Sequence, residues 1–377
     1  MKPKLQNATR IIKELKGANL YRSLRYGKIS GAHIKFGSKV LVNFCSNDYL
    51  GLKQPKISIK QMQSSSRLVS GNDPSFKRLE DVLAKHKSQE GALVFPTGYM
   101  ANLGAITALI GKNDLILSDE LNHASIIEAC RLCNARTLIY NHNDVDDLEK
   151  RIRSNKNQRK FIITEGIFSM DGDFAPLDKI SQISNKHNAV LILDDAHGDF
   201  TVGQDGKGTA NHFGVDKEVG VYISSLSKGL GSFGGYIATE EPGIEMCVNR
   251  SKSFIYTSAL PSFLIDISLK RFSQNRELQR KHLQKNTNMM HAGLKNIGYD
   301  IKSSSHIIPI LVGSEKKALE FGSFLFKNGI FAQPIRYPTV AKKSARIRIS
   351  MTAWISETQI QRALDVFDKA GKKFKIL

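Results

Sequence analysis

A lysine stands where a predicted buried strand ends, beyond the middle of the chain. The apolar residues 219–224 are followed directly by the sequence SLSKGLG, residues 225–231, which contains Lys228. A lysine in such a place, where water is largely excluded, can act as a nucleophile and as a base. The hydroxyl groups of Ser225 and Ser227 can donate hydrogen bonds to a phosphate. The alternative interpretation is an ordinary exposed loop lysine.

An aspartate and a histidine follow a second predicted strand, residues 190–193, in the sequence DDAHG, residues 194–198. Asp194 is expected to be poorly hydrated there, and such a carboxylate needs a cationic partner. A protonated pyridine nitrogen would meet this need, and the pairing would make the heterocycle an electron sink. His197 is placed to bond a second polar atom. A structural ion pair and a metal site are alternatives, although no further cluster with ligand spacing accompanies these residues.

A strand-to-helix turn forms a predicted anion site. The sequence PTGYMAN, residues 96–102, joins the predicted strand at 92–95 to a predicted helix at 98–110. Free backbone N–H groups at a helix N-terminus bind anions, and Gly98 allows a phosphate to approach the backbone closely.

Two further segments carry candidate side chains. His123 follows a predicted strand, and its ring could lie flat on an aromatic cofactor; a structural histidine is the alternative. Arg346 and Arg348 alternate in a predicted strand, residues 345–350, and therefore share one face. One of them could clamp a carboxylate through two hydrogen bonds, and the pattern does not choose between them.

Two weaker motifs are discounted. Gly229, Gly231 and Gly234 match G-x-G-x-x-G, but residues 235–239 predict a strand, whereas a dinucleotide-binding motif opens a helix. Cys130 and Cys133 form a C-x-x-C inside a predicted helix, with no second pair near them. We therefore expect neither a dinucleotide site nor a metal site.

Alternating strands and helices surround these residues. This alternation is typical of an α/β fold with a mostly parallel sheet, which helices cover on both faces and which carries function at the carboxyl ends of its strands. The predicted strands are residues 92–95, 114–118, 137–140, 161–164, 190–193 and 219–224, and the predicted helices are residues 98–110, 125–133, 145–152 and 177–186.

The pattern changes near residue 260. A long helical stretch is predicted to about residue 294, followed by a strand at 307–312, a helix at 316–327, a strand at 345–350 and a helix from residue 357. The 377 residues, 41% of them hydrophobic, exceed what one compact layer pair needs. We expect an N-terminal helix and hairpin-like segment at 1–43, a large α/β domain at 44–259 and a small α+β domain at 260–377.

The formal net charge of +20 suggests an anionic partner, such as nucleic acid, a membrane or an acidic substrate or carrier. The basic residues are spread along the chain and form no nucleic-acid-binding motif, so we expect no nucleic-acid partner. The N-terminus lacks a secretory apolar region, and no apolar run reaches the roughly 20 residues that span a bilayer. We therefore expect no membrane association and a cytoplasmic location.

The chain resembles the α-oxoamine synthases, a branch of the fold-type-I pyridoxal-phosphate enzymes. The resemblance runs nearly from end to end, in motifs that occur in the family's order. These are SNDYLGL at 46–52, RLVSG at 67–71, NHAS at 122–125, EGIFSMDGD at 165–173, DDAHG at 194–198, SKGLG at 227–231, YTSALP at 256–261 and YPTV at 337–340.

The resemblance implies a role for each candidate cofactor residue. Pyridoxal 5'-phosphate is held as a Schiff base on Lys228, which is also the base at the substrate Cα. Asp194 pairs with the pyridine nitrogen, His197 bonds the ring hydroxyl oxygen, and His123 stacks on the ring beside the substrate. The backbone groups of Gly98 and Tyr99, with the hydroxyl of Ser225, hold the phosphate, and Ser169 lies close to the cofactor.

The resemblance also implies the substrates. The family condenses a small amino acid with an acyl thioester and releases CO₂. Arg348 would hold the amino-acid carboxylate, and Arg22 and Thr339 would contact the acyl substrate. The segments at 67–71, 164–166 and 338–340 favour L-alanine and a pimeloyl thioester (pimeloyl-CoA or pimeloyl-acyl carrier protein), as used in biotin synthesis.

Alternatives to this assignment are kept open. Within the family, glycine and acetyl-CoA are the alternative substrates, because residues 234–236 and 341–344 depart from the alanine-using pattern. Outside it, a nicotinamide oxidoreductase would need a glycine motif that opens a helix, and a nucleic-acid-binding protein would need a clustered basic face. The family implies a homodimer in which Thr257 and Ser258 reach the partner's cofactor phosphate.

Overall fold

The computed structural model describes residues 6–59, 64–155 and 158–377, which form two compact units. One unit contains the described residues up to Ser46, the short segment Met170–Gly172 and His282–Leu377. The other contains the described residues from Asn47 to Ser169 and from Asp173 to Lys281. The predicted domain limits at residues 43 and 259 stay predictions.

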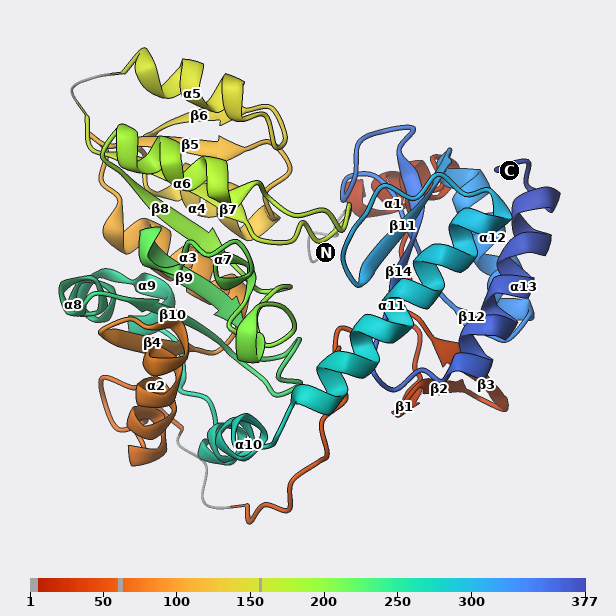
Figure 1. Ribbon diagram of the computed structural model, residues 1–377, viewed down its shortest axis with the longest axis horizontal. Coiled ribbons are helices and arrows are strands. Elements are labelled where there is room, and N and C mark those ends of the chain that lie inside the picture. Colours follow the sequence, from red (N-terminus) through yellow and green to blue (C-terminus); the bar gives the residue numbers. More distant parts are fainter. Residues whose placement is uncertain (1–5, 60–63, 156–157) are drawn as a thin grey trace. The chain divides into compact units, whose positions relative to one another are not determined.

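The larger unit is built on a seven-stranded sheet (Figure 1). The strand order is β4-β10-β9-β8-β7-β5-β6; β10 runs antiparallel to both neighbours and every other pair is parallel. The mostly parallel sheet predicted from the sequence is thus confirmed. The strands are β4 (Gly91–Phe95), β5 (Leu115–Asp119), β6 (Arg136–Tyr140), β7 (Lys160–Glu165), β8 (Ala189–Asp194), β9 (Val219–Ser225) and β10 (Gly235–Thr239).

Helices cover both faces of this sheet, with α5 and α6 in front and α3 and α4 behind in Figure 1. Every residue of β5 and β7 is buried, because a strand covered on both sides has no face left for water. The core between the sheet and α3 includes Phe95, Ile106 and Ile223. The helices are α2 (Pro74–Lys87), α3 (Gly98–Leu109), α4 (Ala124–Leu132), α5 (Val145–Arg153), α6 (Leu177–Lys186), α7 (Thr209–His212), α8 (Glu241–Arg250), α9 (Lys252–Ile255) and α10 (Ser262–Phe272).

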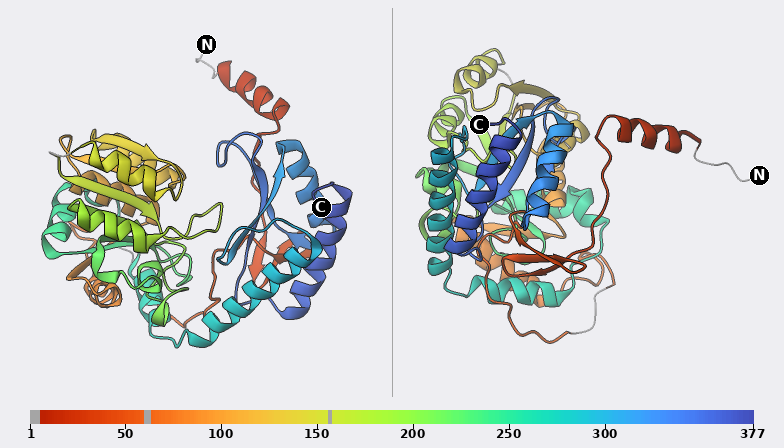
Figure 2. Two further views of the ribbon diagram at one scale, coloured as in Figure 1. Left: turned by 45° about the horizontal axis from the view of Figure 1, so that its top comes forward. Right: turned by 90° about the vertical axis from the view of Figure 1, so that its right-hand side faces the viewer.

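The smaller unit contains two sheets. The three-stranded antiparallel sheet has the order β11-β14-β13, with α12 packed against all three strands, and α12 and α13 lie along it in Figure 2. The other sheet has the order β1-β2-β3-β12. The elements are α1 (Gln6–Gly17), β1 (Lys28–Ser30), β2 (His33–Phe36), β3 (Lys39–Asn43), β11 (Ile307–Gly313), α12 (Glu315–Lys327), β12 (Ile330–Phe331), β13 (Gln333–Ile335), β14 (Ala345–Ser350) and α13 (Glu357–Lys373).

One predicted element is wrong. The continuous helix expected over residues 260–294 is two helices, α10 and α11 (Glu277–Ile297). The break occurs at the polar residues Ser273, Gln274 and Asn275, where the Asn275 side chain accepts a hydrogen bond from the Glu277 N–H. Asparagine and serine compete with helical hydrogen bonds in this way, so they favour helix ends.

Two absences concern membranes and metals. Among the residues that the structure describes, no helix combines the length and apolar character that a membrane span needs. Within those same residues, no group of three His, Cys, Asp or Glu side chains is placed to hold a metal ion. Of the C-x-x-C pair, Cys133 Sγ donates to the backbone oxygen of Cys130 at 3.1 Å, a contact within the end of α4.

His142 links the end of strand β5 to the segment that follows the neighbouring strand β7. Its Nδ1 lies 2.9 Å from Asp119 Oδ1, at the end of β5, and its Nε2 lies 2.7 Å from Asp173 Oδ2, in the segment that follows β7. Its ring meets the Phe168 ring edge-on, with centroids 4.4 Å apart. Burial lowers the pKa of His142, but the hydrogen bonds to the two carboxylates raise it more, to about 10. The imidazolium therefore stabilises the segment around Ser169.

This shift predicts a pH-dependent stability. The folded-state pKa of His142 lies above its ordinary value of 6.5, so the stabilisation is complete below pH 6.5 and is lost as the pH rises through 10. Between pH 6.5 and 10, the free energy of unfolding of the native protein should fall by about 2 kcal/mol more than that of His142→Gln, allowing for solvent screening. Chemical denaturation at several pH values measures this. His282→Gln, at an exposed histidine of α11, should behave like the native protein. Parallel pH profiles for the native protein and His142→Gln would contradict the assignment.

Candidate active site

Polar residues gather at the carboxyl ends of adjacent parallel strands in the larger unit. Asp194 is the last residue of β8 and pairs in register with Glu165, the last residue of β7. Ser225 is the last residue of β9, and Lys228 follows three residues later. His123 follows β5 and caps the N-terminus of α4. This edge of a doubly covered parallel sheet is where such folds bind ligands.

Asp194 is buried with an incomplete set of partners. Its Oδ2 accepts a hydrogen bond of 2.7 Å from Asn102 Nδ2, and its Oδ1 accepts one of 3.0 Å from the Ala196 N–H. Its relative exposure is only 6%. Among the described residues, no Lys, Arg or His side chain forms a salt bridge with it. A buried carboxylate in this state requires a cation from elsewhere, because its desolvation costs several kcal/mol.

Lys228 lies next to His197. The distance from Lys228 Nζ to His197 Nε2 is 2.8 Å, and the other ring nitrogen of His197 lies 2.6 Å from the hydroxyl of Tyr49. Because the Tyr49 hydroxyl is also 3.2 Å from Asn47 Oδ1, it is held in place from two sides. The sequence brings together Asp194 and His197 through a tight turn, in which the Gly198 N–H bonds the carbonyl of Asp195. The Lys228 amine therefore contacts the His197 imidazole, which lies in the turn that begins at Asp194.

The N-terminus of α3 meets the end of β9. Thr97 caps the helix by accepting a hydrogen bond from the Met100 N–H, which leaves the N–H groups of Gly98 and Tyr99 without intrahelical acceptors. A Cβ atom on Gly98 would stand 3.2 Å from Ser225 Cβ, so the glycine permits this close approach. Ser225 Oγ lies 2.8 Å from Ser227 Oγ. These N–H and hydroxyl donors form an anion-binding cradle of the kind that holds phosphate.

His123 is connected to Asp194 by a chain of hydrogen bonds. Asn102 Nδ2 donates both to Asp194 and, at 3.1 Å, to Ser125 Oγ. Ser125 Oγ lies 2.7 Å from His123 Nδ1, which also accepts from the Ser125 N–H at 3.3 Å. These bonds make Nδ1 an acceptor, so the proton of the neutral ring is on Nε2. The ring is exposed, so that an aromatic ligand could cover it.

Ser169 and Glu165 lie at the end of β7. The backbone N–H groups of Ser169 and His123 bond to the Glu165 carboxyl group. Burial raises the pKa of Glu165 well above its ordinary value, and the nearby Asp194 carboxylate raises it further. Burial and the neighbouring carboxylate thus both favour the protonated form of Glu165.

The predicted substrate residues lie in the smaller unit. Arg22 Nη2 donates to Thr339 Oγ1 at 3.0 Å, although the two residues are 317 positions apart. On β14, Arg346 forms a salt bridge of 2.5 Å with Asp171, while Arg348 is buried and donates to Ser350 Oγ at 2.7 Å. A carboxylate of the chain itself therefore holds Arg346, which shares a strand face with Arg348.

Sequence reasoning missed three residues of this edge: Tyr49, Asn102 and Glu165. Asn102 follows Gly98 by four positions, so it lies on the same helix face as the anion site, and that spacing was a usable signal. Tyr49 had no such signal, because its contact with His197 joins positions that are 148 residues apart.

The residues present fit pyridoxal phosphate. Within the described chain Asp194 has no salt-bridge partner, and a protonated pyridine would supply the cation. The Gly98–Ser225 cradle has the donors that a phosphate needs, and Lys228 offers an amine for the aldehyde. His197 could bond a further oxygen of the ring, and His123 could cover it.

Comparisons with known proteins agree with this fit. A model of the family "Aminotransferase class I and II" matches residues 39–367. The 8-amino-7-oxononanoate synthase of Thermoanaerobacter pseudethanolicus is 39% identical over 383 aligned positions, which cover 97% of each protein. A serine palmitoyltransferase variant from S. paucimobilis, solved with a bound PLP-myriocin aldimine, has a TM-score of 0.93 at 25% identity over all of both chains. The 8-amino-7-oxononanoate synthase of Francisella tularensis has a TM-score of 0.74 at 28% identity and covers 88% of this chain and 98% of its own.

The close packing at the anion-binding cradle predicts that cofactor binding is sensitive to substitution of Gly235. A Cβ atom on Gly235 of β10 would stand 2.5 Å from both the N and Cα atoms of Gly98, so Gly235→Ala must displace the start of α3. We expect the dissociation constant of pyridoxal phosphate to rise about tenfold or more, since a displaced cradle loses charge-assisted hydrogen bonds. Fluorescence titration with the cofactor measures this. Gly17→Ala is the matched control, because a Cβ there meets no atom within 4 Å. Unchanged cofactor affinity in Gly235→Ala would show that the phosphate binds elsewhere.

Proposed function

We propose that this chain is a pyridoxal-phosphate-dependent 8-amino-7-oxononanoate synthase. It belongs to the aminotransferase class I and II family and to its α-oxoamine synthase branch, and this is the premise of the proposal. The reaction would condense L-alanine with a pimeloyl thioester, of CoA or of acyl carrier protein, in biotin biosynthesis. The observation that carries the proposal is that Asp194, buried and without a salt bridge among the described residues, lies with His197 and Lys228 at one sheet edge. The 39% identity to a named synthase over nearly its whole length supports this choice of substrates.

The overall chemistry is balanced as follows. One C–C bond forms between Cα of alanine and the thioester carbonyl carbon, and the C–S bond breaks to release the thiol. The bond from Cα to the carboxylate breaks to release CO₂, and a proton from solvent balances the equation. When bound, pyridoxal phosphate supplies an aldehyde for the amine and a heterocycle that accepts electrons from Cα.

The residues of the chain have separate tasks in this proposal. Lys228 holds the cofactor between turnovers and removes the proton from Cα, while His197, 2.8 Å from Nζ, can share that proton. Asp194 keeps the pyridine nitrogen protonated. The backbone of Gly98 and Tyr99 binds the phosphate, together with Ser225.

The remaining assignments rest on the family resemblance. His123 covers the cofactor ring and contacts the substrate, and Ser169 lies beside the cofactor. Arg348 binds the carboxylate of alanine, for which a guanidinium is suited because it can donate two parallel hydrogen bonds. Arg22 and Thr339 contact the acyl substrate. Homodimerisation and a cytoplasmic location stay predictions of the sequence.

Crossing the substrates tests the proposal. Alanine and glycine are each combined with pimeloyl and acetyl thioesters, and the products are identified by mass spectrometry. We expect the highest kcat/KM for alanine with the pimeloyl thioester, by about tenfold or more over glycine, since one methyl group in a fitted pocket is worth that much. Lys228→Ala should lose turnover with every pair. The highest rate with glycine and acetyl-CoA would instead identify a 2-amino-3-ketobutyrate ligase.

A further inference from the structure

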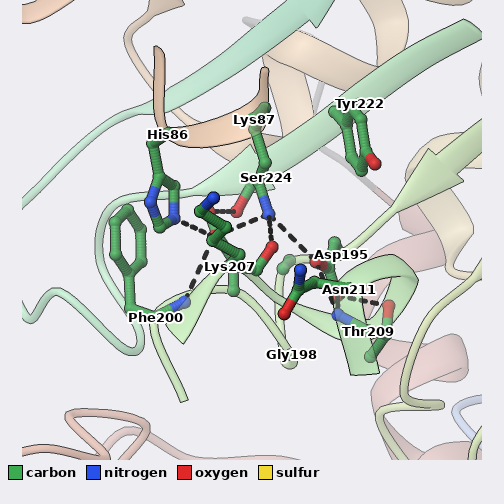
Figure 3. A network of polar contacts seen from close by, with 12 residues as sticks. His86, Lys87, Asp195, Gly198, Phe200, Lys207, Thr209, Asn211, Tyr222 and Ser224 are labelled. Atoms are coloured by element: carbon green, nitrogen blue, oxygen red, sulfur yellow. Dashed lines mark hydrogen bonds and ion pairs between the residues drawn. The ribbon is translucent and has the colours of Figure 1, made fainter. Parts of the chain in front are cut away.

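A second cluster of charged residues is completely buried beside the candidate active site in the larger unit (Figure 3). Lys87, the last residue of α2, places Nζ 3.1 Å from Asp195 Oδ2 and 2.7 Å from Asp199 Oδ1, and donates to the Lys207 carbonyl at 2.8 Å. The side chain of Lys87 is 1% exposed and both carboxylates are 0% exposed. None of the mechanistic tasks described above uses these residues.

Asp199 is the centre of the cluster. Its Oδ1 lies 2.9 Å from His86 Nε2 and also accepts from the Phe200 N–H. Its Oδ2 accepts from Ser224 Oγ at 2.8 Å and from the Tyr236 hydroxyl at 2.5 Å. One carboxylate thus joins α2, β9 and β10 to the turn that follows β8.

Three residues of the cluster lie within two positions of a candidate cofactor residue in the chain. Asp195 follows Asp194 directly, and Ser224 precedes Ser225 directly. Asp199 is two positions beyond His197. Gly229, which follows Lys228, packs so closely on the Asp199 carbonyl that a Cβ there would stand 2.5 Å from its oxygen. The cluster therefore contacts all three backbone segments that carry Asp194, His197, Ser225 and Lys228.

Asp195 fastens the same turn from the other side. Its Oδ1 accepts from Thr209 Oγ1 at 2.7 Å, and its carboxylate also accepts from the Thr209 N–H. Gly208 has a φ of +97°, and a Cβ on it would collide with Asp195 Oδ2. The start of α7 therefore packs directly on this carboxylate, which Thr209 and Lys87 both contact.

The cluster contains two carboxylates, one ammonium group and one imidazole, and burial acts differently on the pKa of each. Burial disfavours the Lys87 ammonium, but Asp199 and Asp195 outweigh it and hold its pKa above the ordinary value. Burial lowers the pKa of His86, so this ring is neutral. Burial raises the pKa of Asp195 to about 6, against the attraction of Lys87. Lys87 is therefore the main cation for two carboxylates.

Two other polar groups face the cluster. The Tyr222 ring lies 5.1 Å from Lys87 Nζ, and its hydroxyl donates to the Asp216 carbonyl at 3.0 Å, away from Asp199. The Arg276 guanidinium lies over the Phe200 ring, 6.0 Å from its centroid, and burial lowers the pKa of Arg276 against the opposing effect of the Asp199 carboxylate. Neither donates a hydrogen bond to Asp199 within the described part of the chain.

We propose that Lys87 and Asp199 are positioning residues of the active site: their buried ion pair holds the Asp194–His197 turn against the β9–Lys228 segment, and so sets the geometry and charge around the cofactor. This inference rests on the proposed function for its kinetic consequences, but not for its effect on the cofactor. It adds to the reaction a pair of residues that touch neither substrate nor cofactor.

Tyr236→Phe is the mildest test, because it removes one donor from Asp199 and keeps the ring. The negative charge of Asp199 is then less compensated by hydrogen bonds. This charge favours the protonated form of the Schiff base between Lys228 and the cofactor. The pH midpoint of the visible absorption band of the holoenzyme should rise by about 0.5 unit or more. For alanine, kcat should fall about tenfold while KM changes little, as expected for a displaced catalytic group.

Tyr222→Phe is the matched control. It also removes a buried tyrosine hydroxyl, but one that bonds a backbone carbonyl and not Asp199. We expect Tyr222→Phe to lower the melting temperature by about as much as Tyr236→Phe does. The pH midpoint of the absorption band and kcat of Tyr222→Phe should equal those of the native enzyme. Equal effects of the two substitutions on midpoint and kcat, or no effect of either, would overturn the proposal.

Lys87→Met removes the cation and approximately keeps the volume of the side chain. If it folds, its absorption midpoint should rise further than that of Tyr236→Phe; a native midpoint with saturating cofactor would contradict the proposal. If it does not fold, the Tyr236→Phe comparison decides. If the native enzyme fails to use alanine and a pimeloyl thioester, the proposed function fails, while the absorption titration still decides this inference because it needs no substrate.

Discussion

The structure depends on one electrostatic requirement, a positive charge for the buried carboxylate of Asp194. The chain itself supplies hydrogen bonds from Asn102 and Ala196 but no salt bridge within its described residues. Burial of such a charge is expensive unless a cation completes it. Burial and the neighbouring Asp194 carboxylate raise the pKa of Glu165, which lies in register on the next strand and offers Asp194 no positive charge. Pyridoxal phosphate with a protonated pyridine nitrogen supplies this cation. The same molecule carries a phosphate, an aldehyde and a flat ring, which the neighbouring groups can bind.

The parallel sheet explains why these groups meet. The carboxyl ends of β5, β7, β8 and β9 lie along one edge, and each is followed by a turn that carries a polar side chain. The same edge receives the N-terminus of α3, whose first N–H groups need acceptors. The Lys87–Asp199 ion pair joins the turn after β8 to helix α2. His142, which contacts Asp119 and Asp173, joins the end of β5 to the segment after β7. Two networks of ion pairs therefore hold the turns after the strands in place, because the hydrogen bonds between strands do not extend to these turns.

Much of this arrangement was predictable from the sequence, because it depends on local patterns. Short apolar runs predicted the strands, and the residues that follow them, Asp194, His197 and Lys228, are consequently at strand ends. The glycine motif at 229–234 was correctly rejected, since β10 follows it. What could not be predicted depends on distant contacts: Tyr49 with His197, Arg22 with Thr339, and Lys87 with two aspartates over 100 residues away. The break between α10 and α11 was missed because three polar residues only modestly weaken a helical pattern.

The central claim is that Lys228 carries the cofactor. Reduction of the holoprotein with borohydride, followed by proteolysis and mass spectrometry, would identify the modified side chain directly. The account predicts a pyridoxyl phosphate adduct on the peptide that contains Lys228, at close to one per chain and at no other lysine. An adduct on a different lysine, or a holoprotein from which reduction leaves the cofactor free to dissociate, would contradict it.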